Sequence, residues 1–207
     1  EMKAFATHWK KLNVKFDGIC TGFFASAEQI RFAESFLRDF GGEDTLIVVD
    51  PVLGDNGALY GCFSEEYVQA MRTLCKAARL ITPNHTEAAL LAGCSMDTDV
   101  NDLLEKLPVE NVIITGVRRG EEIGYCARLD GEYTEIFRPC IPQTLHSTGD
   151  VFASALCGAL MNGKTMPCAL EDAAKFCDDC VQKTVKRGEA HWYSLAFEDV
   201  LKEERER

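Results

Sequence analysis

Short segments rich in β-branched residues alternate along this chain with longer segments whose apolar residues recur at helical spacing. A strand, a helix and a further strand in that order form a right-handed crossover between parallel strands. The alternation therefore predicts an α/β fold with a mostly parallel central sheet and helices on both faces. The predicted strands are 16–20, 45–52, 79–82 and 111–116, and the predicted helices between them are 26–40, 64–78, 84–92 and 100–107.

The second half of the chain adds a hairpin and two long helices. Strands 124–129 and 133–138 flank Asp130-Gly131, a dipeptide typical of tight hairpin turns. Helices are also predicted over 150–161, 169–186 and 2–12, and a charged tail over 198–207. No internal repeat, low-complexity linker or boundary interrupts this pattern, so residues 1–207 are expected to form a single domain.

The composition excludes some classes of partner. A formal net charge of -11 argues against nucleic acid, because binding it requires clustered Lys and Arg, although a nucleotide can be held by backbone dipoles and a metal. No apolar run approaches the roughly 18–20 residues that span a bilayer.

The ten cysteines need not form a disulfide framework in a chain of this size, so reduced thiols and a cytoplasmic location are expected. Cys177 and Cys180 have the spacing of a zinc pair, but no second pair completes four ligands.

A turn of small residues leads directly into the apolar helix predicted at 150–161, and Asp150 stands at the start of that helix. The free N–H groups and positive dipole of a helix N-terminus can hold phosphate. A carboxylate beside such a cradle suits the removal of a proton from an attacking hydroxyl, which suggests phosphoryl transfer to an alcohol. The alternative is that Asp150 only caps or charges the first helical turn.

Ligands of open parallel sheets bind at the carboxyl ends of the strands, which draws attention to the loops there. Loop 50–57 crowds two carboxylates and two glycines, and it is either a solvated turn or a functional loop. Asn84 and Glu87 have the spacing of a capping box, yet they also suit the orientation of waters around Mg²⁺, and the two interpretations are compatible. The motifs of P-loop and dinucleotide-binding proteins are absent from the sequence.

Four segments in order resemble the ribokinase-like superfamily: Asp-Pro-Val-Leu-Gly-Asp-Asn-Gly at 50–57, Thr-Pro-Asn-x-x-Glu at 82–87, Ile-Thr-Gly at 114–116 and Ser-Thr-Gly-Asp at 147–150. Within it the chain is most similar to the pyridoxal/pyridoxamine kinases, which phosphorylate the 5′-hydroxymethyl group of B6 vitamers with ATP. The resemblance implies a three-layer ribokinase-like fold. The related hydroxymethylpyrimidine kinases are similar too, but they usually carry Cys where this chain has Asp150.

The resemblance also implies roles for individual residues. Asp150 would be the general base, and the backbone amides of Ser147, Thr148 and Gly149 would form the anion hole for the transferred phosphoryl group. Asn84 and Glu87 would organise Mg²⁺ through water, and Asp50 and Asp55 would lie near the metal and the phosphates. Thr115 would lie near the phosphates of ATP, and Phe23 would present its ring to the substrate. Use of a monovalent cation stays open.

Two departures from the family pattern affect what is expected. Ser147 replaces the usual glycine of the turn, and its Cβ restricts the backbone if φ is positive. The family normally has a further N-terminal portion that supplies the first strand and much of the vitamer pocket, so the chain is expected to be N-terminally incomplete. An exposed sheet edge would then favour self-association, and a homodimer is expected. A non-catalytic nucleotide-binding or assembly protein and a hydroxymethylpyrimidine kinase are the alternatives.

Overall fold

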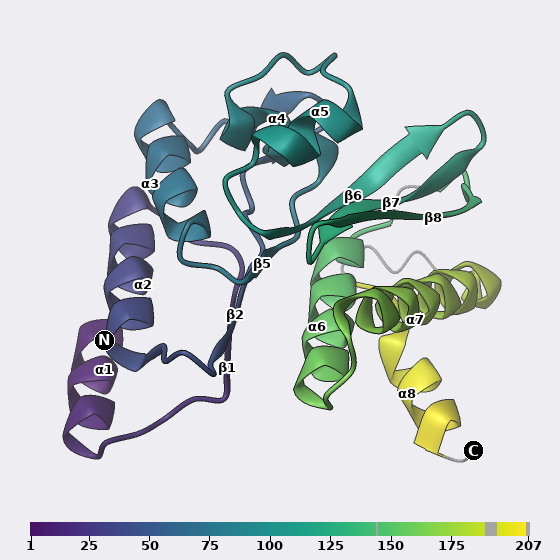
Figure 1. Cartoon of the computed structure of the whole chain (residues 1–207). Helices are drawn as coiled ribbons and strands as arrows, with labels where there is room; N and C mark the ends of the chain where they lie inside the picture. Colours follow the sequence, from purple (N-terminus) through teal and green to yellow (C-terminus); the bar gives the residue numbers. More distant parts are fainter. Residues whose placement is uncertain (144, 189–193, 206–207) are drawn as a thin grey trace. The chain divides into compact units, whose positions relative to one another are not determined.

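The computed structural model describes residues 1–143, 145–188 and 194–205 (Figure 1). These residues group into two compact units. The first unit, here called the N-terminal unit, contains Glu1–Val117 and Cys126–Glu135. The second, the C-terminal unit, contains Arg118–Tyr125 and Ile136–Arg207. The expectation of a single domain over 1–207 stays a prediction.

The central sheet is mostly parallel, as the sequence predicts. Its strands follow the order β1-β2-β5-β6-β7-β8, and β1 pairs with β2, β2 with β5 and β5 with β6 in parallel. Val48 pairs with Leu80, and Leu80 with Asn111, which sets the register of the three central strands. The strand bounds are Gly18–Thr21 (β1), Leu46–Val49 (β2), Leu80–Ile81 (β5), Asn111–Arg119 (β6), Glu122–Leu129 (β7) and Glu132–Pro139 (β8).

The central strands are apolar on both faces. Val48, Val49, Leu80 and Ile81 are completely buried, and so is the apolar run of β6 at 112–114. Continuous rather than alternating burial is typical of parallel strands that are covered on both sides. It also explains why short segments with little polar content form the centre of this sheet.

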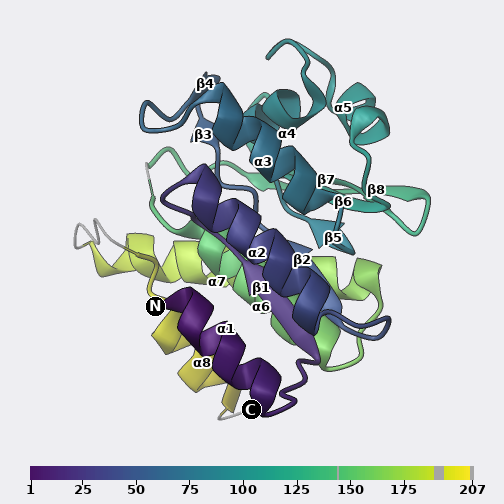
Figure 2. The same cartoon turned by 90° about the vertical axis from the view of Figure 1, so that its left-hand side faces the viewer.

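Five helices belong to the N-terminal unit, and α1, α2 and α3 lie side by side in it (Figure 2). Helix α2 buries Ile30, Ala33, Leu37 and Phe40, whose spacing places them on one helical face. Ser26 caps this helix by accepting the N–H of Gln29. The bounds are Met2–Lys11 (α1), Ala27–Phe40 (α2), Glu65–Cys75 (α3), His85–Ala92 (α4) and Val100–Lys106 (α5).

The two long helices predicted in the second half are confirmed as α6 (Thr148–Met161) and α7 (Met166–Arg187) of the C-terminal unit, and they pack against each other (Figure 1). The charged tail predicted near 198–207 forms helix α8 (Phe197–Arg205) in its described part, and the sequence did not predict this helix. The helix is explained by its burial of Val200 and by the ion pair of Asp199 with Arg187 of α7.

Two further findings bear on the class of protein. No helix among the described residues is long and apolar enough to cross a bilayer. All ten cysteines lie in the described part of the chain, and none of them forms a disulfide. Cys177 and Cys180 are both buried in helix α7, which agrees with ordinary helix packing.

Candidate functional site

The loop after β2, predicted to be either a solvated turn or a functional loop, folds back as a small hairpin. Strands β3 (Gly54–Asp55) and β4 (Ala58–Leu59) pair in antiparallel fashion. Asn56 and Gly57 connect them with φ of 51° and 80°, the left-handed pair of a tight hairpin turn. A Cβ on Gly54 would lie 2.2 Å from the carbonyl oxygen of Ala58, so this close pairing requires glycine.

Glu87, on the first turn of α4, binds the backbone of this loop. Its carboxylate accepts hydrogen bonds from the backbone N–H of Leu53 at 3.0 Å and from that of Asn84 at 2.8 Å. The side chain is only 5% exposed, and this burial raises its pKa from the ordinary value of 4.5 to about 8 despite the backbone hydrogen bonds, which lower it. Glu87 is therefore a buried acid whose charge is costly, and it fixes two backbone segments at once.

Asn84 completes a capping box with Glu87, so the structural interpretation of this pair is confirmed. Its side-chain oxygen accepts the N–H of Glu87 at 2.9 Å, and its amide donates to the carbonyl of Gly54 at 2.8 Å. The hydroxyl of Thr86 accepts the N–H of Gly57 at 2.9 Å. The N-terminus of α4 therefore determines the position of the β3–β4 hairpin.

Asp50 and Thr115 lie at the same edge of the sheet as Asn84. The carboxylate of Asp50 accepts the hydroxyl of Thr82 at 3.2 Å. The backbone N–H of Thr115 donates to the carbonyl of Pro83 at 2.8 Å, and residue 115 forms an isolated parallel bridge with residue 84. The structure thus brings together Asp50, Asn84, Glu87 and Thr115, as expected for the carboxyl ends of neighbouring parallel strands.

Asp55 is oriented differently from the other acids. It is exposed, and its carboxylate accepts the backbone N–H of Asn56 at 2.8 Å and the side-chain amide of the same residue at 3.0 Å. These contacts are those of an Asp that stabilises its own turn.

A magnesium ion fits these residues only through water. Among the described residues there is no group of three or more His, Cys, Asp or Glu side chains that could hold a metal. The side chains of Asn84 and Glu87 are already engaged in backbone hydrogen bonds, although each oxygen can accept a further bond from water. Mg²⁺ keeps several of its waters and needs few protein ligands, so this donor set suits it.

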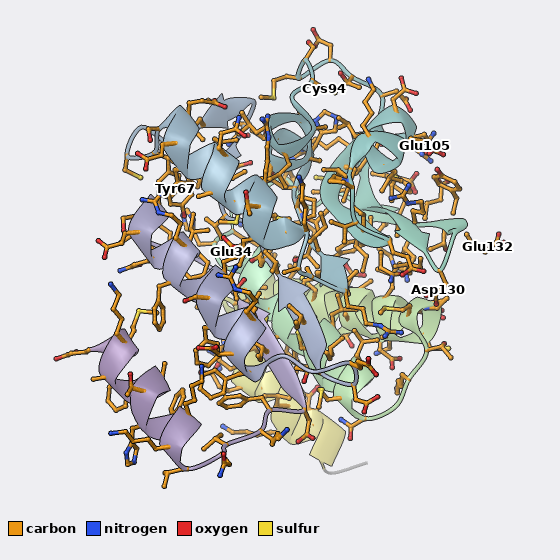
Figure 3. The ribbon with its side chains drawn as sticks, turned by 60° about the vertical axis from the view of Figure 1, so that its left-hand side comes forward. Glu34, Tyr67, Cys94, Glu105, Asp130 and Glu132 are labelled. Carbon is orange, nitrogen blue, oxygen red and sulfur yellow. The ribbon has the colours of Figure 1, made fainter. Side chains whose placement is uncertain are left out.

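Phe23 follows β1 and is 64% exposed. Its ring centroid lies 5.9 Å from that of Phe63, and Phe63 stacks on Tyr67 with centroids 3.8 Å apart. Tyr67 lies on α3 (Figure 3), and its hydroxyl donates to the carbonyl of Phe24 at 2.9 Å, next to Phe23. Phe63 and Tyr67 were not singled out in the sequence analysis. Their spacing of four residues at the start of a helix could have indicated that the two rings lie side by side.

In the C-terminal unit, the turn before α6 has the positive φ at Ser147 that would strain a residue other than glycine. Ser147 has φ 64° and ψ 19°, in the left-handed region. Thr148, Gly149 and Asp150 form the exposed first turn of α6. The free N–H groups of that turn and the carboxylate of Asp150 therefore face solvent at a helix N-terminus.

Solved structures confirm the predicted fold. The pyridoxal kinase of Lactobacillus plantarum is 30% identical, with a TM-score of 0.89 over 97% of this chain and 75% of that one. A Bacteroides thetaiotaomicron protein is 37% identical, with a TM-score of 0.91 over 97% of this chain and 73% of that one. Its name assigns it provisionally to the phosphomethylpyrimidine kinases. A second crystal form of that protein contains pyridoxal.

Sequence relatives agree with these structures. The pyridoxine kinase of Bacillus subtilis is 28% identical over 181 residues, which are 81% of this chain and 65% of that protein. A Schizosaccharomyces pombe protein, provisionally named a pyridoxal kinase, is 33% identical over 150 residues, 67% of this chain and 47% of the relative. The chain therefore spans between about half and two thirds of the length of these relatives.

The sheet, its helices and these neighbours show a ribokinase-like α/β fold, and the neighbours are named as kinases. A family model described as phosphomethylpyrimidine kinase matches residues 8–194. The chain belongs to this family, and the proteins that resemble it include pyridoxal and pyridoxine kinases.

Proposed function

We propose that this chain transfers the γ-phosphoryl group of ATP to the 5′-hydroxymethyl group of a B6 vitamer, namely pyridoxal, pyridoxine or pyridoxamine. The observation that carries the proposal is the carboxylate of Asp150 on the exposed first turn of α6. An acid in that position repels phosphate, but it can take the proton from an attacking hydroxyl. The amides of Ser147, Thr148 and Gly149 would hold the transferred phosphoryl group.

The cluster in the N-terminal unit supports a role in holding the nucleotide phosphates. Asn84 and Glu87 would hold Mg²⁺ through water, with Asp50, Asp55 and Thr115 near the metal or the phosphates. The ion would supply neutralisation of charge on the phosphates, which is the main requirement of phosphoryl transfer. Asp55 is the weakest member of this set, since its carboxylate already serves its own turn.

The acceptor is proposed to be a B6 vitamer for two reasons. The Bacteroides thetaiotaomicron relative, at 37% identity, has been crystallised with pyridoxal. Phe23 is an exposed ring beside Phe63, and an aromatic face of this kind suits a flat heteroaromatic ring. The description of the matching family favours hydroxymethylpyrimidine as a second candidate acceptor. Asp150 argues against it, because the hydroxymethylpyrimidine kinases usually carry Cys there.

The test is a product assay with the purified chain. We expect incubation with MgATP and each of the three B6 vitamers to give the 5′-phosphate of at least one of them. Phosphorylation of hydroxymethylpyrimidine alone would favour the second candidate. Binding of ATP in a calorimeter without any phosphorylated product would instead favour a non-catalytic nucleotide-binding or assembly protein and would refute the proposal.

Two properties of the molecule in the cell are also proposed. We infer a homodimer, since β1 stands at the end of the strand order among the described residues and a strand edge can pair with another chain. We also infer a cytoplasmic location from the abundance of cysteines without disulfides. Light scattering coupled to size exclusion would test the first, and fractionation of cells that express the chain would test the second.

A further inference from the structure

Cys177 contacts the first residue of helix α6 from the neighbouring helix α7. Its thiol donates a hydrogen bond to the carbonyl oxygen of Thr148, with 3.7 Å between sulfur and oxygen. Cys177 is only 5% exposed, and burial raises its pKa to about 11, so the thiol keeps its proton at neutral pH. A buried donor from α7 is therefore directed at the turn that carries Asp150.

Tyr125, on β7, contacts the next turn of the same helix, at Phe152. Its ring stacks on that of Phe152 with centroids 4.4 Å apart and an angle of 21° between the planes. Phe152 belongs to α6 and is fully buried. The hydroxyl of Tyr125 also makes a hydrogen bond with the thiol of Cys177. The start of α6 is thus connected to two other elements of the C-terminal unit.

We propose that Cys177 and Tyr125 are positioning residues for phosphoryl transfer, which fix the first turn of α6 through Thr148 and Phe152. The inference rests on the proposed function of Asp150. Neither side chain needs to contact a substrate. Both hold the backbone amides and the carboxylate in one place, and a misplacement of about 1 Å can lower a rate about 100-fold.

The strain at Ser147 gives this chain a particular need for contacts that hold the first turn of α6 in place. A non-glycine residue in the left-handed region is less stable than one in the ordinary helical region. A strained turn persists only where its surroundings hold it. The contacts of Cys177 and Tyr125 are contacts of that kind, because Thr148 is next to Ser147 and Phe152 lies five residues further along the same helix.

Matched variants separate positioning from general packing. Cys177→Ala removes the donor, Cys177→Ser keeps a donor of similar size, and Tyr125→Phe removes the hydroxyl but keeps the ring on Phe152. Cys180→Ala is the control, since Cys180 is also buried on α7 and lies three residues further along. We expect Cys177→Ala to lower kcat about 10-fold with KM for ATP within twofold, Tyr125→Phe to lower it less, and Cys177→Ser to restore it to within about threefold.

A readout independent of catalysis keeps the two proposals apart. Amide hydrogen exchange of the peptide over 147–152 should become at least about threefold faster in Cys177→Ala than in the wild type and in Cys180→Ala. If the wild type phosphorylates no vitamer, the proposed function fails while this exchange result still tests the positioning role. Equal kcat losses in Cys177→Ala and Cys180→Ala, no rescue by Cys177→Ser, or unchanged exchange would overturn the inference.

Discussion

The carboxylate of Glu87 accepts a hydrogen bond from the backbone N–H of Leu53 at 3.0 Å, across 34 positions of sequence. Its other oxygen accepts the N–H of Asn84 at 2.8 Å. A single buried acid therefore joins the loop after β2 to the start of α4. The position of the proposed phosphate-binding loop depends on this side chain.

Glu87→Ala should destabilise the protein strongly. The substitution leaves the N–H groups of Leu53 and Asn84 without their acceptors, and each unsatisfied buried group costs about 1–3 kcal/mol. We expect the free energy of unfolding in urea to fall by about 2–4 kcal/mol. The control is Glu66→Ala, because the ion pair of Glu66 with Arg31 is exposed and contributes about 1 kcal/mol or less. A loss below about 1 kcal/mol in Glu87→Ala would contradict the account.

Stability should fall as the pH rises because of the same residue. The pKa of Glu87 is about 8 in the folded state and near the ordinary 4.5 in the unfolded state. Between these values the unfolded chain has released the proton and the folded chain has kept it, so a rise in pH favours unfolding. Below 4.5 and above about 8 the contribution is constant.

The pH effect is measured as a difference between the wild type and Glu87→Gln, which cannot titrate at this position. From pH 5 to pH 8.5 the stability of the wild type relative to this variant should decrease by at least about 1 kcal/mol, since one pKa unit corresponds to about 1.4 kcal/mol. Urea titrations at several pH values give this quantity. A difference that stays constant or increases with pH would mean that burial does not raise the pKa of Glu87.

Most of the fold could be predicted from the sequence because the signals are local. The strand and helix alternation places nearly every element, and the Asp130-Gly131 turn indicates the β7–β8 hairpin. The boundaries of short strands shift by a few residues: β5 covers only Leu80–Ile81 of the predicted 79–82. Helix α8 was missed because its pattern is mostly charged, and only contacts with α7 show that Val200 is buried.

The candidate site was harder to predict where it depends on contacts between distant segments. Asn84 and Glu87 could be paired from their spacing, but nothing local shows that Glu87 accepts the N–H of Leu53. The stack of Phe63 on Tyr67 and the contact of Cys177 with Thr148 are likewise products of tertiary packing. The strain at Ser147 could be predicted, because a serine stands where the family usually has glycine and its Cβ is unfavourable if φ is positive. In the structure φ is 64°.

Ser147→Gly should stabilise the protein or leave it unchanged. A left-handed non-glycine residue costs about 1–2 kcal/mol, while the greater freedom of glycine in the unfolded chain offsets about 0.5–1 kcal/mol. We expect a net gain of about 0.5–1 kcal/mol, measured by urea unfolding. Ser147→Val is the matched control and should lose stability, since β-branched residues tolerate positive φ poorly. A clear loss of stability in Ser147→Gly would show that the serine contributes more than strain.

Phe63→Ala should weaken binding of the acceptor and leave ATP binding unchanged. Its ring lies between Phe23 and the buried Tyr67, so its loss leaves Phe23 without its neighbour. An aromatic pair contributes about 0.5–1.5 kcal/mol, and we expect KM for the preferred vitamer to rise about 3- to 10-fold. The control is Tyr133→Ala, which removes another exposed aromatic ring. An equal change in KM for ATP would show a general loss of structure instead.

The most direct test of the central claim is the turnover of Asp150→Asn with MgATP and the preferred vitamer. Asn has nearly the same size and keeps a polar group at the helix start, but it cannot accept a proton from the hydroxyl. The account predicts that kcat falls about 100-fold or more, while the affinity for ATP in a calorimeter changes less than about threefold. Turnover near that of the wild type would contradict the role of Asp150 as the general base.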